Sequence, residues 1–303
     1  MAHSVLTPTS SDTLSPPEAI ASVRRLVWKI AIATVILMAI GSATRVANAG
    51  LACPDWPLCY GQLVPTAQMN LQVFLEWFHR LDASIIGLLT IVLVGQTWWR
   101  RSLLPNWLPW AALASLALVL VQGLLGGLTV TEMLRFDIVT AHLGTALLFF
   151  VTVLAIGVAL LPYQGNGTAN RLRWLSLAAA ILVYGQSLLG ALVASQWALH
   201  QCLSYQSLCT VMNSHILGVV PPTLAVLALG VWAWRTPALS WPLRRLAKAA
   251  LALVAVQIGL GMATFYLRLQ VELLSVAHQT VGALLLGTLV AFTVFANRDS
   301  RLA

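Results

Sequence analysis

The segment Glu76-Trp77-Phe78-His79-Arg80 lies within a long apolar stretch and brings a carboxylate, an imidazole and a guanidinium close together. Residues three apart share one face of a helix, so Glu76 and His79 would point in the same direction. Charged groups within a membrane are expensive, and where they occur they usually mark a site rather than scaffold. The segment therefore predicts a membrane-spanning helix that carries functional side chains.

The histidine of this segment belongs to a repeat. His79 and His215 are 136 residues apart, and so are His142 and His278, which gives the two pairs the same internal spacing of 63 residues. When a unit is duplicated in tandem, each of its residues recurs at the same distance along the sequence, as these histidines do. The four histidines therefore predict two related halves, each with one pair.

A second motif marks the same repeat. Val119–Gly127 has the sequence VLVQGLLGG and Val254–Gly261 has VAVQIGLG, and their glutamines precede the next histidine by 20 and 21 residues. We expect the glycines of these segments to allow close helix packing rather than to contact a ligand. A tandem duplication of a four-helix unit is the simplest explanation.

Composition places the chain in a lipid bilayer. Of 303 residues, 59% are hydrophobic and 9% are charged, against roughly 25% charged in an average soluble domain. Apolar segments of about 20 residues, the length that crosses a membrane, recur along the chain. We expect an all-α integral membrane protein with eight transmembrane helices at about 26–46, 71–95, 107–128, 137–161, 172–194, 211–234, 246–266 and 272–296.

The repeat divides this architecture into two four-helix bundles, related by a pseudo-twofold axis along the membrane normal. Residues 23–165 would form the N-terminal half and residues 166–303 the C-terminal half. Residues 1–22 are rich in Ser, Thr and Pro and lack an apolar core. They are expected to form a disordered cytoplasmic tail and not a signal peptide.

Basic residues predict the orientation, because short cytoplasmic loops carry the excess of Lys and Arg. With both termini in the cytoplasm, 13 of the 17 basic residues fall on the cytoplasmic side: Arg24, Arg25, Lys29, Arg100, Arg101, Arg171, Arg173, Arg235, Arg244, Arg245, Lys248, Arg298 and Arg301. The net charge of +8 then reflects membrane topology, and we expect no nucleic-acid partner.

The four histidines are candidate metal ligands. His79, His142, His215 and His278 fall in the outer halves of their helices, and each half supplies one from its second helix and one from its fourth. Two imidazoles that face each other across a bundle can hold a haem iron axially. The alternative is that these side chains only form hydrogen bonds between helices.

Glu76 is a candidate catalytic residue. Beside a haem pocket, a carboxylate can relay protons or stabilise a cationic intermediate. The alternative is an ion pair with Arg80, its neighbour one helical turn later. Only the first half has a glutamate three residues before its histidine, which favours a division of labour between the halves.

Four cysteines lie in two loops on the predicted external side: Cys53 and Cys59 in the first, Cys202 and Cys209 in the second. The oxidising compartment permits disulfides there. Two structural crosslinks, one in each loop, are the simplest arrangement, although four cysteines permit three connectivities. A redox role for the first pair remains an alternative, because its loop is enlarged and close to His79.

Three arginines lie on the external side, against the charge bias: Arg45, Arg135 and Arg268. A guanidinium is well suited to bind the propionates of a haem. The alternative is that these side chains extend to the membrane interface. The sequence leaves the two possibilities open.

The sequence resembles the haem A synthases, in particular the bacterial type with paired cysteines in the extracytoplasmic loops. The resemblance covers nearly the whole chain after the tail. It rests on Gly41–Arg45 (GSATR), on Gly50–Cys59 (GLACPDWPLC) with Gly61 and Pro65 following, on Glu76–Arg80 (EWFHR) and on the other three membrane histidines.

The resemblance implies a multi-pass protein of the bacterial cell membrane that oxidises the C8 methyl of haem O to the formyl group of haem A, for cytochrome oxidase. His215 and His278 would ligate a resident haem b in the second half. His79 and His142 would face or ligate the substrate haem O in the first, with Glu76 close to the reacting region.

The resemblance also implies that the cysteines of the first loop form a disulfide that takes part in electron or haem transfer, and that the second pair is structural. Expected partners are the lipid bilayer, haem O synthase, cytochrome oxidase assembly factors, an electron acceptor outside the chain and a second copy of the chain. The main alternative function is that of a di-haem b-type cytochrome that passes electrons from quinol, and a haem transporter is a third.

Overall fold

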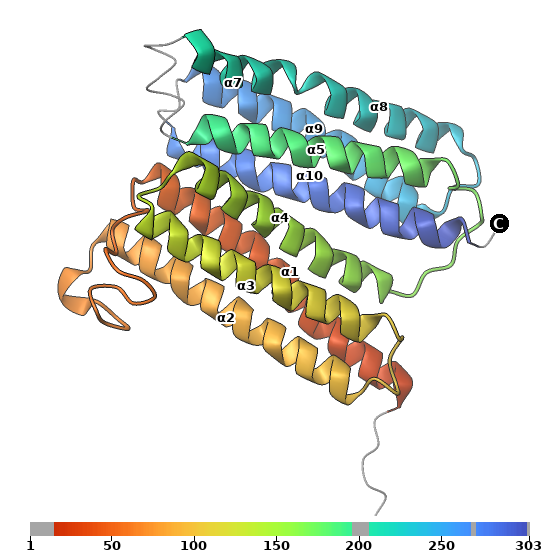
Figure 1. Ribbon diagram of the computed structural model, residues 1–303. Coiled ribbons are helices and arrows are strands. Elements are labelled where there is room, and N and C mark those ends of the chain that lie inside the picture. Colours follow the sequence, from red (N-terminus) through yellow and green to blue (C-terminus); the bar gives the residue numbers. More distant parts are fainter. Residues whose placement is uncertain (1–14, 196–205, 268–270, 302–303) are drawn as a thin grey trace, which may run out of the picture.

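The computed structural model describes residues 15–195, 206–267 and 271–301 (Figure 1). The helices are α1 (Pro16–Val46), α2 (Leu71–Trp99), α3 (Leu108–Thr131), α4 (Phe136–Ala159), α5 (Leu172–Ala194), α7 (Gln206–Leu217), α8 (Val220–Arg235), α9 (Trp241–Tyr266) and α10 (Glu272–Asp299). Over the described ranges, the other regular elements are the short 3-10 helix η1 (Thr66–Gln68) and one isolated bridge, Cys59 to Gln62.

The helices confirm the predicted fold class. Within the ranges that the structure describes, eight segments are long and apolar enough to cross a membrane, with α7 and α8 contributing one segment together, Thr210–Arg235. Large apolar side chains such as Ile32, Leu88, Leu120 and Leu224 are exposed on the outside of the helices. An apolar exterior of this kind matches lipid rather than water. The chain is therefore a multi-pass membrane protein.

Two predicted boundaries differ from the structure. α1 begins at Pro16, so residues 16–22, which we assigned to the tail, are helical. The cause is a capping box: the Glu18 carboxylate accepts a hydrogen bond from the main-chain N–H of Ser15 at 2.9 Å and one from its hydroxyl at 2.7 Å, which satisfies donors at the helix start. Residues 1–14 lie outside the described ranges.

The sixth span is interrupted. The sequence predicted one helix over 211–234, whereas α7 ends at Leu217 and α8 begins at Val220. Pro221 and Pro222 follow the break, and a proline removes a main-chain donor and clashes with the preceding turn. His215 therefore lies on the last turn of the shorter helix.

The helices form two rings of four. In the first, α1 contacts α2, α2 contacts α3, α3 contacts α4 and α4 returns to α1. In the second, α5, α8, α9 and α10 close in the same order, with α7 against α5 (Figure 1). The rings meet through α4 with α10, α1 with α10 and α4 with α5. A twofold axis between α4 and α10 would produce this set of contacts, but the symmetry and the boundary at residue 165 stay predictions.

The core follows this arrangement. One buried apolar cluster lies within the first ring and includes Ile30 and Leu108. A second runs from Phe150 on α4 through Phe292 on α10 into α5, α8 and α9. Close packing between the rings holds the two sets of histidine-bearing helices at fixed positions.

The linker between the rings is fastened by a buried carboxylate at the end of α10. Asp299 accepts hydrogen bonds from the Tyr163 hydroxyl at 3.0 Å, the Asn166 N–H at 2.9 Å and the Ala169 N–H at 2.8 Å. Burial raises the pKa of Tyr163 to about 12, so its hydroxyl keeps the proton that it donates. This carboxylate ties the chain between α4 and α5 to the last helix.

Candidate functional site

Glu76 lies on the second turn of α2 and is buried, with 4% of its surface exposed. One carboxylate oxygen accepts a hydrogen bond from the main-chain N–H of Cys53, with an N···O distance of 2.9 Å. The other forms an ion pair with Arg80, one turn later on the same helix. The structural alternative, a salt bridge to Arg80, is therefore present. The catalytic role of Glu76 stays a prediction.

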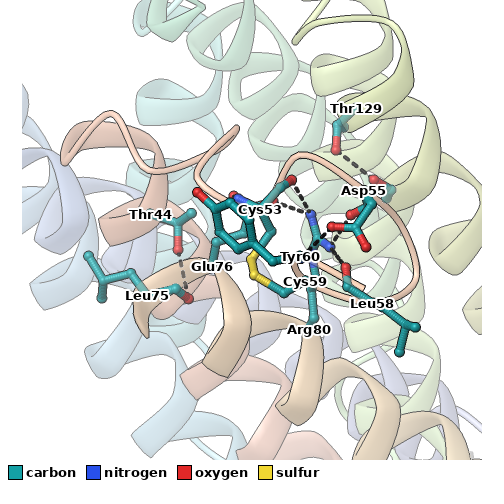
Figure 2. Close-up of polar contacts among 11 residues, drawn as sticks. Thr44, Cys53, Asp55, Leu58, Cys59, Tyr60, Leu75, Glu76, Arg80 and Thr129 are labelled. Atoms are coloured by element: carbon teal, nitrogen blue, oxygen red, sulfur yellow. Dashed lines mark hydrogen bonds and ion pairs between the residues drawn. A yellow bond between two sulfur atoms is a disulfide. The ribbon is translucent and has the colours of Figure 1, made fainter. Parts of the chain in front are cut away.

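Arg80 fastens the loop between α1 and α2 to the helix. Its Nη1 donates to the main-chain oxygens of Asp55 and Leu58, both at 2.5 Å, and its Nη2 donates to the oxygen of Cys53 at 3.1 Å. Figure 2 shows the guanidinium beneath the loop, with these carbonyls and Glu76 around it. A guanidinium has five N–H donors in a fixed plane, which suits this cluster of acceptors.

The same loop contains a disulfide. Cys53 and Cys59 are bonded, with their Cα atoms 4.8 Å apart, and both residues are buried. The prediction of this pair is confirmed, and whether it takes part in redox chemistry stays open. Cys202 lies outside the described residues, as does the side chain of Cys209 in α7, so the second predicted pair is not tested.

Asp55 organises the turn at the other end of the loop. Its carboxylate accepts hydrogen bonds from the main-chain N–H groups of Tyr60 at 2.6 Å and Gly61 at 2.7 Å. These bonds, chiefly the one from Gly61, hold the pKa of Asp55 below its usual value. Gly61 has φ 68°, a conformation that glycine adopts without strain. The carboxylate thus stays charged and keeps the turn closed.

Trp56 places this loop against the first ring. A Cβ atom added at Gly127 on α3 would lie 3.2 Å from Cδ2 of the Trp56 indole. The preceding residue, Gly126, faces His142 in the same way, at 3.3 Å from its Cε1 atom. The disulfide loop therefore lies over α3, one residue from the glycine that contacts a predicted ligand.

Each of the four histidines packs against a helical glycine. A Cβ atom added at the glycine would lie 2.8 to 3.3 Å from the Cε1 atom of the ring in the pairs Gly41 with His79, Gly126 with His142, Gly190 with His215 and Gly261 with His278. Real Cβ atoms almost never lie as close to another heavy atom as the shortest of these distances. A residue with a Cβ atom in place of glycine would therefore displace the imidazole ring. In each half, one of the two contacting glycines lies on the first helix, α1 or α5, and the other lies on α3 or α9.

The second pair of histidines has the geometry of two ligands on one metal ion. The ring centres of His215 and His278 are 6.4 Å apart, and the ring planes are nearly perpendicular, at 85°. A metal–imidazole bond is about 2 Å long, so imidazoles on opposite sides of one ion have centres about 6 Å apart. The structure thus brings these predicted ligands together at a distance that fits a haem iron between them.

In the first pair, His79 on α2 packs against Gly41 of α1, and His142 on α4 packs against Gly126 of α3. Among the described residues, Nδ1 of His79, His142 and His278 is buried without a hydrogen-bond partner. A buried polar atom without a partner is costly, and binding to a metal would satisfy it. These nitrogens are the second observation that fits the prediction of haem ligands.

Two of the three predicted propionate ligands, Arg45 and Arg135, already have protein partners. Nη1 of Arg45 donates to the carbonyl oxygen of Ala194, at the end of α5, at 2.7 Å. Arg135 makes two hydrogen bonds of 2.8 Å to Asp137 and a longer ion pair with Glu132 at 3.4 Å. Arg268 lies outside the described residues. The role of all three toward a haem stays a prediction.

A cavity of about 380 Å³ opens between α4 and α5. It is lined by Thr140 and Gly144 from one helix and by Tyr184 and Leu188 from the other. None of the four histidines lines it, and its polar side chains are those of Asp137, Thr140, Thr145 and Tyr184. It therefore belongs to the contact between the rings rather than to the candidate haem sites.

Sequence reasoning missed three glutamines that contact the histidines. The side-chain nitrogen of Gln122 lies 3.2 Å from Nε2 of His142, that of Gln257 lies 3.4 Å from Nε2 of His278, and that of Gln186 lies 3.0 Å from Nδ1 of His215. The signal that could have found them is a glutamine four residues before three of the four contacting glycines, Gly126, Gly190 and Gly261. Two of these glutamines were noted only as markers of the repeat.

Comparison with known proteins agrees with this geometry. The family model COX15-CtaA, described as cytochrome oxidase assembly protein, matches residues 24–290. The chain is 27% identical to the Heme A synthase of Shewanella oneidensis, over 89% of this chain and 96% of that protein. It is 27% identical to the Heme A synthase of Sphingopyxis alaskensis, over 95% of both chains, and 28% identical to that of Caulobacter vibrioides, over 88% of this chain and 94% of that protein.

The family model spans nearly all of the two helical rings, including the disulfide loop and the four histidines. The chain therefore belongs to the COX15-CtaA family of cytochrome oxidase assembly proteins.

Proposed function

We propose that this protein is a haem A synthase, which oxidises the C8 methyl of haem O to the formyl group of haem A. The observation that carries the proposal is the pair of imidazoles His215 and His278 with ring centres 6.4 Å apart, in a chain whose relatives bear that name. The reaction converts a methyl and a water into a formyl group, four protons and four electrons. An acceptor outside the chain takes the electrons.

The two halves would have different tasks. His79 and His142 would hold the substrate haem O, beneath the loop that carries Trp56. His215 and His278 would hold a resident haem b, which supplies one-electron redox chemistry when bound. The separation of 6.4 Å between the latter rings supports this assignment of ligands.

Within the first half, residues of the chain would position the substrate and shield it from water. Glu76 and Arg80 hold the disulfide loop in place against α3, the helix whose Gly126 faces His142, and the loop would shield the first pair of histidines from water. A dry site strengthens the interactions of charges inside it. Glu76 would then act near the reacting methyl either by carrying protons or by keeping the loop closed.

The topology of the proposed enzyme follows the basic residues: both termini in the cytoplasm and the disulfide loop outside. The proposed partners are haem O synthase, which makes the substrate, factors that assemble cytochrome oxidase, and a second copy of the chain. The orientation can be tested independently by labelling single cysteines in intact cells.

Extraction of the haems after co-expression with haem O synthase tests the function. We expect haem A to appear with the wild-type chain and to be absent with His142→Ala, while haem O accumulates. A wild-type chain that binds haem but never yields haem A would contradict the proposal. No observation on the described residues favours the di-haem cytochrome, which would leave both haems unmodified.

A further inference from the structure

Two tryptophans at the ends of α2 and α3 mark one edge of the membrane. Trp98, near the end of α2, packs edge-on against Trp110, near the start of α3, with ring centres 5.4 Å apart. Tryptophan is enriched where a bilayer meets water. Because a helix rises 1.5 Å per residue and the hydrocarbon core is about 30 Å thick, the opposite edge lies about 20 residues away. That outer edge is therefore near Phe78 on α2 and near Val130 on α3.

The disulfide loop reaches down to this outer edge. Nε1 of Trp77 donates a hydrogen bond to the main-chain oxygen of Leu63 at 2.7 Å, which holds Leu63 beside the second turn of α2. Leu58 and Leu63 of the loop also line a small cavity of about 110 Å³ together with Leu81 and Ser84 of α2. The last two residues lie on the membrane side of the estimated edge. In Figure 1 the loop accordingly lies beside the outer end of α2.

The contact of the loop with α3 is at the same depth. Trp56 packs against Gly127, which lies one turn before the end of α3 and on the membrane side of the estimated edge. Arg80 of α2 binds the carbonyl oxygens of Asp55 and Leu58, and it also lies below the edge. The loop is therefore packed alongside both helices at the depth of the outer leaflet, and does not extend into the water above them.

The surface that the loop turns outward is apolar. Leu63 is 82% exposed, and Leu58 and Val64 are exposed as well. These three residues are named the loop patch. The exposed side chains of Phe74 and Leu81 continue this surface along α2, whose outside matches lipid. Exposed apolar side chains of this size are unfavourable in water, so the continuity of the loop patch with the lipid-facing side of α2 favours lipid as its neighbour.

The main chain of the loop is suited to such a position. Lipid offers no hydrogen bonds, so a segment that enters it must satisfy its polar groups within the protein. Side chains of α2 donate to three carbonyl oxygens of the loop, those of Asp55, Leu58 and Leu63. The Asp55 carboxylate accepts from two N–H groups of the loop. Cys59 and Gln62 exchange two main-chain hydrogen bonds, both of 3.1 Å.

We propose that the disulfide loop is inserted into the outer leaflet of the bilayer, with the loop patch of Leu58, Leu63 and Val64 in contact with lipid acyl chains. The loop is then held from two sides, by Arg80 and Trp77 within the protein and by lipid on its outer surface. The inference goes beyond the proposed function and does not depend on it, because lipid contact is measured without any haem chemistry.

Photocrosslinking in a bilayer identifies the neighbour of the loop patch. The full-length chain, with p-benzoylphenylalanine in place of Leu63, is reconstituted into vesicles of phosphatidylcholine and phosphatidylglycerol and irradiated. We expect lipid adducts on the acyl chains, located by mass spectrometry, at a yield close to that for the same probe at Leu88, which is 64% exposed in the middle of α2. The matched control is Gln164, which is exposed in the linker between α4 and α5 and should give little lipid adduct.

Two other results at position 63 would overturn the proposal. A crosslink to a second copy of the chain would make the loop patch a protein interface, and a yield no higher than that at Gln164 would place it in water.

A charged substitution gives a second, independent measurement. Leu63→Asp should drive the loop out of the leaflet and speed reduction of the Cys53–Cys59 disulfide by dithiothreitol in vesicles about fivefold, the size of effect that a charge near the membrane interface has. Leu63→Met keeps an apolar side chain and should reduce at the wild-type rate. Because Leu63 is exposed, neither substitution removes a contact of the buried core. Equal rates for the two variants would contradict lipid insertion.

Discussion

The two halves of the molecule have the same histidines but different surroundings. In the second half, His215 and His278 face each other with a glutamine beside each ring. In the first half, one ring has a glutamine and the other, His79, has Leu37 in that place. The comparison teaches that two halves with the same set of histidines can differ in the residues that contact them.

The ion pair at the disulfide loop differs in the same way. Met212 and Ile216 stand in the second half where Glu76 and Arg80 stand in the first, three residues before and one residue after the histidine. Apolar side chains at these positions cannot bind the carbonyls of a loop. The Glu76–Arg80 ion pair that holds the disulfide loop thus has no counterpart at these positions of the second half.

The largest effect is expected from removal of a ligand. His278→Ala should lower the haem content of the second half at least about tenfold, because one imidazole remains where two now face each other. His142→Ala should spare that haem and empty only the first half. The haem-to-protein ratio and the absorption spectrum of the purified variants measure this. Equal losses from both variants would show that the halves do not bind haem independently.

The next effect concerns the ion pair that only the first half has. Arg80→Leu leaves the Glu76 carboxylate buried without its cation, which costs about 3 kcal/mol in comparable buried pairs. The loop should open, and the Cys53–Cys59 disulfide should be reduced faster by dithiothreitol, as followed by alkylation and mass spectrometry. Arg135→Leu is the matched control, because its ion pairs are exposed and such pairs contribute at most about 1 kcal/mol.

A smaller effect is expected where a glycine touches a ring. A Cβ at Gly261 would lie 3.0 Å from His278, whereas a Cβ at Gly259, on the same helix, has no neighbour within 4 Å. Gly261→Ala should weaken haem binding and lower the thermal midpoint of the holoprotein. Gly259→Ala should raise stability by about 0.5 kcal/mol, since alanine favours the helix. Equal shifts in both variants would mean that the ring does not depend on this contact.

The smallest effect is a dependence of the loop on pH. The pKa of Asp55 is below its usual value of 3.8 in the folded protein, so its contribution to loop stability is complete above that value and is lost as the pH falls through the folded pKa. Hydrogen exchange of the loop, corrected for the intrinsic rate, should therefore rise in acid. In Asp55→Asn the extra acid sensitivity should disappear, and its persistence would assign the effect to another group.

Much of the fold could be predicted because the membrane makes it simple. Length and apolar content fix eight spans, and the equal spacing of His79, His142, His215 and His278 reveals the repeat. The start of α1 was missed because the capping box of Ser15 and Glu18 lies in a polar segment. The break before α8 was missed because apolar composition continues through it, although Pro221 and Pro222 were visible.

The site was predictable in its ligands but not in their restraints. Spacing identified the histidines, and the haem chemistry came from the family resemblance rather than from any pattern. Which ring nitrogen meets Gln122, Gln186 or Gln257 depends on how far each helix is rotated toward its neighbour, and periodicity does not give that angle. Likewise, the sequence did not decide whether Glu76 is a catalytic residue or the partner of Arg80 in an ion pair. Its hydrogen bond from the Cys53 N–H could not be predicted, because it depends on the folded loop.

The position of α10 has a consequence for how the protein is made. This helix contacts α1, α4, α5 and α9, and it leaves the ribosome after all of them. The first four helices therefore enter the bilayer before α10, which contacts two of them, has been synthesised. Asp299 can bind the linker at residues 163–169 only after α10 itself has been made. Until then, the nascent chain cannot bring the two halves into their final contact, and the second pair of histidines is incomplete because His278 lies on α10.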